Sequence, residues 1–125
     1  MMPQLTQPFG SYFEFIRNGM NIQQDKSGRG LPITRIETIS NGTVDPNRVG
    51  FAGLTQDDCE NWLLRSGDIL MSHINSVEHL GKTAVYDGTP HALVHGMNLL
   101  CLRADQQRAS PRYIHHLVKS QIASP

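Results

Sequence analysis

The sequence predicts an α+β fold, a mixed and mostly antiparallel strand-rich domain that ends in one helix. Eleven Gly and seven Pro in 125 residues indicate frequent turns. Short apolar runs lie between turn signals such as Asn41-Gly42 and Asp87-Gly88, as in sheets built from short strands. Ser110-Pro111 is typical of a helix start, because Ser caps free backbone N–H groups and Pro fits the first turn. The length and the 38% hydrophobic content fit a single domain over residues 1–125.

Three segments make up the N-terminal part of the chain. Residues 9–24 form a short amphipathic segment with a turn near its middle. Residues 23–30 are polar apart from two glycines, so we expect an exposed, mobile loop. Residues 32–39 are predicted as a strand from their β-branched content and the flanking turn signals. A helix would also suit the spacing of their isoleucines, Ile33, Ile36 and Ile39.

The C-terminal part alternates strands and turns. Thr43-Val44 is expected to begin a short strand, and Thr55 to cap a short helix whose end sends Trp62 and the leucines after it into the core. A turn at residues 66–68 precedes further strands, which are predicted at 69–71, 82–86 and 98–103, with 92–95 pairing between the last two. The helix that starts at Ser110 then places Ile114, Leu117 and Val118 on one face.

Charge and targeting signals are weak. Eleven basic and eleven acidic residues give a formal net charge of zero, so any nucleic-acid role must depend on a local basic surface or on partner chains. No apolar run is long enough to span a membrane, and the N-terminus has no pattern of a signal peptide. Cys59 and Cys101 are expected to be free buried thiols. These features favour a cytoplasmic protein.

Catalysis finds little support in the sequence. Asp68 could be a catalytic carboxylate, but an acceptor of backbone N–H bonds in the turn before a strand is the favoured interpretation. His91 and His95 have no nearby Cys or carboxylate that would complete a metal site. Phosphate-binding glycine motifs are absent, and the acidic residues are too scattered for a magnesium-dependent nuclease. No catalytic residue, metal or cofactor is therefore expected in this chain.

Three segments in a fixed order resemble a known family. They are Gly30–Ile36 continuing into Ile39–Gly42, Leu64–Ser72 followed by Leu80–Ala84, and Asn98–Arg103 followed by Ser110–Ile114. Together they resemble the target recognition domain of specificity subunits from type I restriction–modification enzymes. Each piece alone is unspecific, whereas the ordered set over about residues 14–120 is much more specific.

The resemblance implies a part of the target-recognition fold that binds double-stranded DNA. Such a domain would read one half of a bipartite target. A methyltransferase subunit would modify adenine with S-adenosylmethionine, and a restriction subunit would translocate and cut DNA with ATP and Mg²⁺. The long helices that join two recognition domains in the family are missing here. We therefore expect an incomplete domain, whose exposed apolar surface could promote self-association.

Two loops and one strand residue carry the side chains suited to DNA. The first loop offers Gln24, Lys26, Ser27 and Arg29, and Arg35 follows on the predicted strand. The second loop, between two strands, offers Ser72, His73, Asn75, Ser76, His79 and Lys82. Arg17 and Arg48 are weaker candidates, and structural roles are expected for Gly67, Asp68 and Gly81.

Other functions remain open at this stage. The first loop could be an ordinary solvated loop, and the second an ordinary connection with local hydrogen bonds. The chain could instead be a protein-interaction module, docking through Tyr113, Leu117 and Val118 on its last helix. A small hydrolase built around Asp68 and a histidine is the third possibility.

Overall fold

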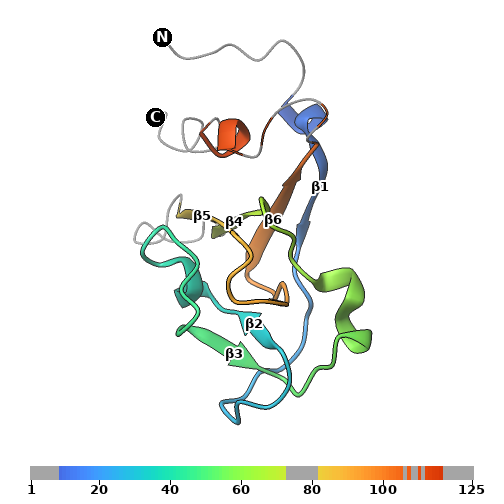
Figure 1. Cartoon of the computed structure of the whole chain (residues 1–125), viewed down its shortest axis with the longest axis vertical. Helices are drawn as coiled ribbons and strands as arrows, with labels where there is room; N and C mark the ends of the chain where they lie inside the picture. Colours follow the sequence, from blue (N-terminus) through green and yellow to red (C-terminus); the bar gives the residue numbers. More distant parts are fainter. Residues whose placement is uncertain (1–8, 73–81, 106, 108–109, 111, 117–125) are drawn as a thin grey trace.

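The protein has two antiparallel sheets, and a short helix at its C-terminal end. The computed structural model describes residues 9–72, 82–105, 107, 110 and 112–116. The larger sheet has the strand order β1-β6-β4-β5, and the smaller one pairs β2 with β3 (Figure 1). The strands are β1 (Phe13–Asn18), β2 (Pro32–Thr34), β3 (Val49–Phe51), β4 (Ile69–Ser72), β5 (Thr83–Val85) and β6 (Leu99–Ala104). The predicted α+β class is confirmed.

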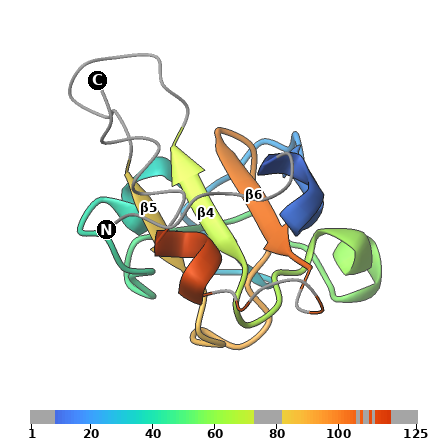
Figure 2. The same ribbon diagram turned by 90° about the horizontal axis from the view of Figure 1, so that it is seen from above.

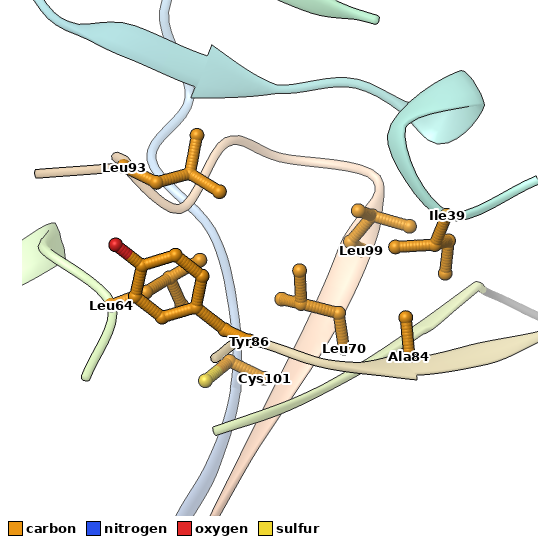
Figure 3. Packing of buried hydrophobic residues seen from close by; sticks show 8 residues of the cluster. All are labelled: Ile39, Leu64, Leu70, Ala84, Tyr86, Leu93, Leu99 and Cys101. Carbon is orange, nitrogen blue, oxygen red and sulfur yellow. The ribbon is translucent and has the colours of Figure 1, made fainter. Parts of the chain in front are cut away.

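The two faces of the larger sheet carry two separate apolar clusters. Leu70, Ala84, Leu99 and Cys101 lie on one face, where they pack with Ile39, Leu64, Tyr86 and Leu93 (Figure 3). Ile69, Leu102 and Ala104 lie on the other face and pack with Phe13 and Ile114. This division follows from the alternation of side chains along each strand.

The C-terminal helix covers the second of these faces. It is described over residues 112–116 and lies across the larger sheet (Figure 2). The Ser110 hydroxyl accepts the backbone N–H of Tyr113 at 3.1 Å, which confirms the predicted N-cap. Ile114 is fully buried against the sheet, whereas Leu117 and Val118 lie outside the described residues.

The smaller sheet is extended by single bridges rather than by a full strand. Val94 bridges Ile33 in parallel and Leu63 in antiparallel orientation. These contacts join β2 to the end of the 3-10 helix η3 (Asp57–Trp62) through a third cluster that contains Ile33, Leu54, Cys59 and Val94. The predicted pairing of residues 92–95 between β5 and β6 is therefore wrong, because this segment leaves the larger sheet to support the smaller one.

The predicted strand at residues 32–39 is only half correct. It ends at Thr34, and Ile36–Ile39 form the 3-10 helix η2. The Thr38 hydroxyl accepts the backbone N–H of Arg35 at 2.8 Å and donates to the carbonyl of Arg48 at 2.5 Å, which closes the turn. The strand expected from Thr43-Val44 forms instead at β3, five residues later in the chain.

The remaining elements agree well with the sequence. Strands were expected at the positions of β4, β5 and β6, and these predictions are confirmed. Thr55 exchanges hydrogen bonds with Asp58 near the start of η3, but the N-cap position is Gln56 rather than the predicted Thr55. Among the described residues, no helix is both long and apolar enough to cross a lipid bilayer.

Candidate nucleic-acid interface

Three backbone ties fix the first predicted loop to the smaller sheet. Asp25 pairs with Phe51 through N–H···O bonds of 2.7 and 3.3 Å. The Arg29 carbonyl accepts the N–H of Gly53 at 3.1 Å, and the N–H of Leu31 donates to Leu54 at 2.9 Å. The loop is exposed, as expected, but these bonds hold both of its ends, which the expectation of a mobile loop did not anticipate.

The tip of this loop is an internally bonded turn. One Asp25 carboxylate oxygen accepts the backbone N–H of Ser27 at 2.9 Å and its hydroxyl at 2.6 Å. The Ser27 hydroxyl in turn accepts the N–H of Arg29 at 3.2 Å. The Ser27 hydroxyl first, and its N–H second, lower the pKa of Asp25 from its usual value. Asp25 and Ser27 therefore shape the turn.

The loop presents two cations to solvent. Lys26 and Arg29 are both exposed. Within the part of the chain that the structure describes, neither forms an ion pair within 4.0 Å, although the Arg29 charge acts on Asp25. Exposed cations of this kind suit contacts to phosphate, which fix a protein on a duplex without reading its sequence.

Gln24 supports the loop from beneath. Its side-chain amide donates to the carbonyl of Thr34 at 3.2 Å. Its Oε1 occupies the space where any side chain on Gly50 would begin, because a Cβ there would lie 1.9 Å from this oxygen. Only glycine at position 50 leaves room for this packing, so β3 and the loop are joined through Gln24.

A cleft opens beside the loop and brings distant segments together. It has a volume of about 310 Å³. Its lining residues come from the approach to the loop, from the start of η2 and from the turn before β6: Ile22, Gln23, Gln24, Arg35, Ile36, Glu37, Met97 and Asn98. Gln24 and Arg35 were predicted as DNA-binding residues, and the structure places them on the same cleft.

An exposed ion pair stands at this cleft. Arg35 Nε donates to Glu37 Oε2 at 3.1 Å, with the two side chains 41% and 57% exposed. The cleft therefore offers a guanidinium, a carboxylate, three amides and some apolar surface. These are the groups with which proteins read the edges of bases.

The turn with Met97 and Asn98 is held by close backbone contacts. The N–H of Met97 donates to the Met20 carbonyl at 3.0 Å, and the N–H of Gly96 donates to the Thr34 hydroxyl at 2.9 Å. A Cβ on Gly19 would lie 2.0 Å from the Gly96 carbonyl oxygen, so the two backbones touch here. Asn98 has a φ of 77°, a conformation that Asn tolerates better than most residues.

The second predicted loop falls mostly outside the described residues. His73, Asn75, Ser76, His79 and Gly81 all belong to that part of the chain. Ser72 is described and is only 3% exposed, since it lies within β4. Its N–H donates to the Lys82 carbonyl at 3.0 Å. This burial argues against a direct contact between the Ser72 hydroxyl and DNA, whereas the half-buried Lys82 reaches the surface.

Asp68 occupies a buried ion pair at the other end of the larger sheet. Both of its oxygens accept bonds of 2.8 Å from Arg103, and Oδ2 also accepts the backbone N–H of Arg65 at 2.8 Å. Gly67 has a φ of 99° in the turn before it. This arrangement fixes the turn between η3 and β4, and the partner Arg103 was missing from the sequence interpretation.

Aromatic rings hold the guanidinium groups of Arg17 and Arg103. Arg17 lies 4.4 Å from the ring centre of Phe15 and 4.7 Å from that of Trp62, and Arg103 lies 4.5 Å from Phe15. This stacking gives Arg17 a structural role. Arg48, the other weaker candidate, pairs with Asp45 at 3.3 Å.

Metal and thiol chemistry find no site in the described part of the chain. No group of three or more His, Cys, Asp or Glu side chains there could hold a metal ion. Cys59 and Cys101 are both free and buried. Burial raises the pKa of each thiol, which keeps it protonated and unreactive.

Three polar residues of the cleft were absent from the predicted DNA-binding residues: Gln23, Glu37 and Asn98. Gln23 adjoins a predicted residue, and Glu37 stands two positions after Arg35. For Asn98, the available signal was an Asn directly before a strand, where left-handed turns are common.

Comparison with known proteins identifies the family. No family model matches the chain. It is 48% identical over 107 residues, 85% of its length, to a protein named as the type I restriction enzyme MjaX specificity subunit of Methanocaldococcus jannaschii. It is also 30% identical over 117 residues, 92% of its length, to the EcoKI specificity subunit of Escherichia coli. The chain spans 25% of the length of each relative. The family resemblance is thus confirmed: the chain is a homologue of a segment of type I restriction enzyme specificity subunits.

Proposed function

We propose that this chain is a DNA-reading unit, which binds one half of a bipartite double-stranded target within a restriction–modification complex. The observation that carries the proposal is the fixed loop with Lys26 and Arg29 beside the Arg35 cleft. The loop supplies phosphate contacts and the cleft supplies groups for base edges. The homology to specificity subunits supports the same role.

The proposal also explains how a chain of zero net charge could bind DNA. Most binding free energy for DNA comes from local phosphate contacts, so the position of the cations matters more than their sum. In Figure 1 the loop lies at the opposite end of the molecule from the C-terminal helix. Cations such as Arg112, on that helix, would remain outside the interface.

Catalysis in this proposal belongs to other subunits. A methyltransferase subunit would modify the bound target, and a restriction subunit would cut the DNA, both in the cytoplasm. The described residues pack the fold or present side chains to DNA, and none is assigned a step of either reaction.

Selection from a random pool of DNA duplexes tests the proposal. The chain is used alone and together with a methyltransferase subunit, at low and at higher salt, and the bound DNA is sequenced. We expect a short motif to be enriched. Binding without a motif, both alone and with the methyltransferase subunit, would mean that the chain binds DNA only through general electrostatic attraction. No binding in either case would refute the proposal.

A charge variant locates the interface. Lys26→Gln with Arg29→Gln should weaken binding for all sequences about equally and should lower the salt dependence, by roughly one unit of slope for each lost phosphate contact. Arg112→Gln is the matched control, because Arg112 is also exposed. An equal loss in both variants would place the DNA elsewhere.

A protein-docking role is the second candidate, and one observation favours it. Ile16 and Tyr113 are large apolar side chains that are 45% and 37% exposed. Tyr113 was predicted as part of a docking face. Loss of methyltransferase capture in a Tyr113→Ser variant, with DNA selection by the chain alone unchanged, would assign this surface to a partner subunit.

A further inference from the structure

The Arg35 side chain makes contacts through its Cδ and Nε atoms, and its terminal guanidinium nitrogens are open. Its Cδ passes over Gly50, where an added Cβ would lie 3.3 Å away. Its Nε is bonded to Glu37. Among the described residues, no hydrogen bond is recorded for the two terminal nitrogens of Arg35. The guanidinium is therefore oriented before any ligand arrives, and the N–H groups of both terminal nitrogens remain for it.

The Glu37 carboxylate determines which ligand suits this arrangement. It lies 3.1 Å from the Arg35 guanidinium and is 57% exposed, so it would repel a phosphate group placed against Arg35. A neutral ligand with two neighbouring acceptors avoids this repulsion. The major-groove edge of guanine, with O6 and N7, is such a ligand, and a fork of Arg donors is its commonest specific partner.

The rest of the cleft fits a base edge better than a backbone. Ile36 is 37% exposed at the cleft, and Met97 adds further apolar surface beside it. The exposed amides of Gln23 and Asn98 can donate and accept hydrogen bonds. By contrast, Lys26 and Arg29 on the loop have no carboxylate bonded to them in the described structure and suit phosphate.

We infer that Arg35 is a specificity-determining residue that reads one guanine of the target, and that Glu37 is its positioning residue. The inference rests on the proposed DNA-reading function and assigns its chemistry to a single side chain. The loop would position the duplex, and the Arg35–Glu37 pair would select a base.

The test compares binding of the whole chain to its selected duplex and to duplexes substituted at each position in turn. The wild type should prefer guanine at one position by about 5-fold to 100-fold, the usual range for a bidentate contact. In Arg35→Lys, which keeps the charge but loses the fork, this preference should fall toward one while other positions keep theirs. Arg48→Lys is the matched control, because Arg48 is also exposed and also forms an ion pair, with the partly buried Asp45.

Glu37→Gln separates positioning from charge. Removing the negative charge should strengthen binding to all duplexes, while the looser Arg35 should discriminate guanine less well. A merely structural Glu37 would not change affinity and selectivity in opposite directions. Circular dichroism of each variant confirms that the fold is retained.

The outcomes distinguish failure of the Arg35 inference from failure of the proposed DNA-reading function. If a motif is selected but Arg35→Lys leaves every base preference unchanged, the inference fails and the DNA-reading function stands. If all positions lose preference equally in Arg35→Lys and Arg48→Lys, Arg35 makes no base-specific contact and the inference also fails. If no motif is selected by the wild type, the proposed function fails, and the inference fails with it.

Discussion

Two arginine–carboxylate pairs in this protein have the same chemistry and opposite surroundings. Arg103 and Asp68 are 13% and 2% exposed and share two bonds, whereas Arg35 and Glu37 are 41% and 57% exposed and share one. In the first pair each charge depends on the other, because water cannot replace a lost partner. In the second pair water can, so the fold does not depend on the pair, and the terminal nitrogens of Arg35 are left for a ligand. Burial, rather than residue type, separates the structural arginine from the one that we propose to read DNA.

The largest expected effect comes from breaking the buried pair. Asp68→Asn keeps an acceptor for the N–H of Arg65 but leaves the Arg103 charge buried without its counter-ion, which should cost about 3–5 kcal/mol in the free energy of unfolding. Urea denaturation of the two proteins measures this difference. The double variant Asp68→Leu with Arg103→Met removes both charges and should lose less than the single one. A loss below about 1 kcal/mol in Asp68→Asn would mean that the pair is not essential for the turn.

A smaller effect is expected from pH, through the buried His95. Its Nε2 donates to the Leu99 carbonyl at 2.6 Å, and its buried Nδ1 has no hydrogen-bond partner among the described residues. Burial first, and the Arg17 charge further, lower the pKa of His95, while the bond to Leu99 acts in the opposite direction. In the unfolded chain His95 takes up a proton near pH 6.5, whereas in the folded chain it stays neutral at that pH. The contribution of His95 to stability is therefore complete above pH 6.5 and is lost as the pH falls toward the lower folded value.

Urea midpoints at pH 7.5 and 5.5 check the sign of this dependence. The wild type should be less stable at the lower pH, and His95→Gln, which retains a donor for Leu99, should show a smaller decrease. An NMR titration of the His95 ring in the wild type gives the folded pKa independently of any variant. A ring that takes up its proton above pH 6.5 would contradict the prediction.

The smallest effect on stability is expected at the exposed pair. Arg35→Gln removes an ion pair that is open to solvent, so the free energy of unfolding should change by less than about 1 kcal/mol. Thermal unfolding monitored by circular dichroism is sufficient to measure it. In the selectivity assay, the same variant should alter DNA selection without altering the fold. A loss of several kcal/mol would instead make Arg35 a structural residue like Arg103.

The sequence predicted the locally encoded features and missed those that distant segments create. The Ser110 cap and the strand after Asp68 depend on neighbours in the chain, and both were found. Strand β3 was missed because Gly50 disfavours a strand by itself, whereas in the fold Gly50 pairs with Ile33 and Gln24 packs against it. Likewise, the strand prediction continued past Thr34 because the hydroxyl of Thr38, which closes the η2 turn, gives no signal in hydrophobic periodicity.

The candidate site shows the same limit. Lys26 and Arg29 could be selected from one polar loop, because their chemistry and their position are both local. The cleft could not, since it joins residues 22–24, 35–37 and 97–98, which only the close contact of Gly19 with Gly96 and the bridges of Val94 bring together. Ser72 was selected for its polar side chain, and its place inside β4 became clear only from the pairing of the sheet.

The three backbone ties of the first loop have a consequence for engineering. They use main-chain atoms of Asp25, Arg29 and Leu31, which any side chain except proline would leave in place. Gly28, at the tip, has a φ of 76° and Ser27 bonds within the turn, so both residues should be kept. The exchangeable positions are therefore Lys26 and Arg29, whose exposed side chains can be varied while the turn keeps its shape. A library built at these positions would allow new DNA affinities to be selected on an unchanged frame.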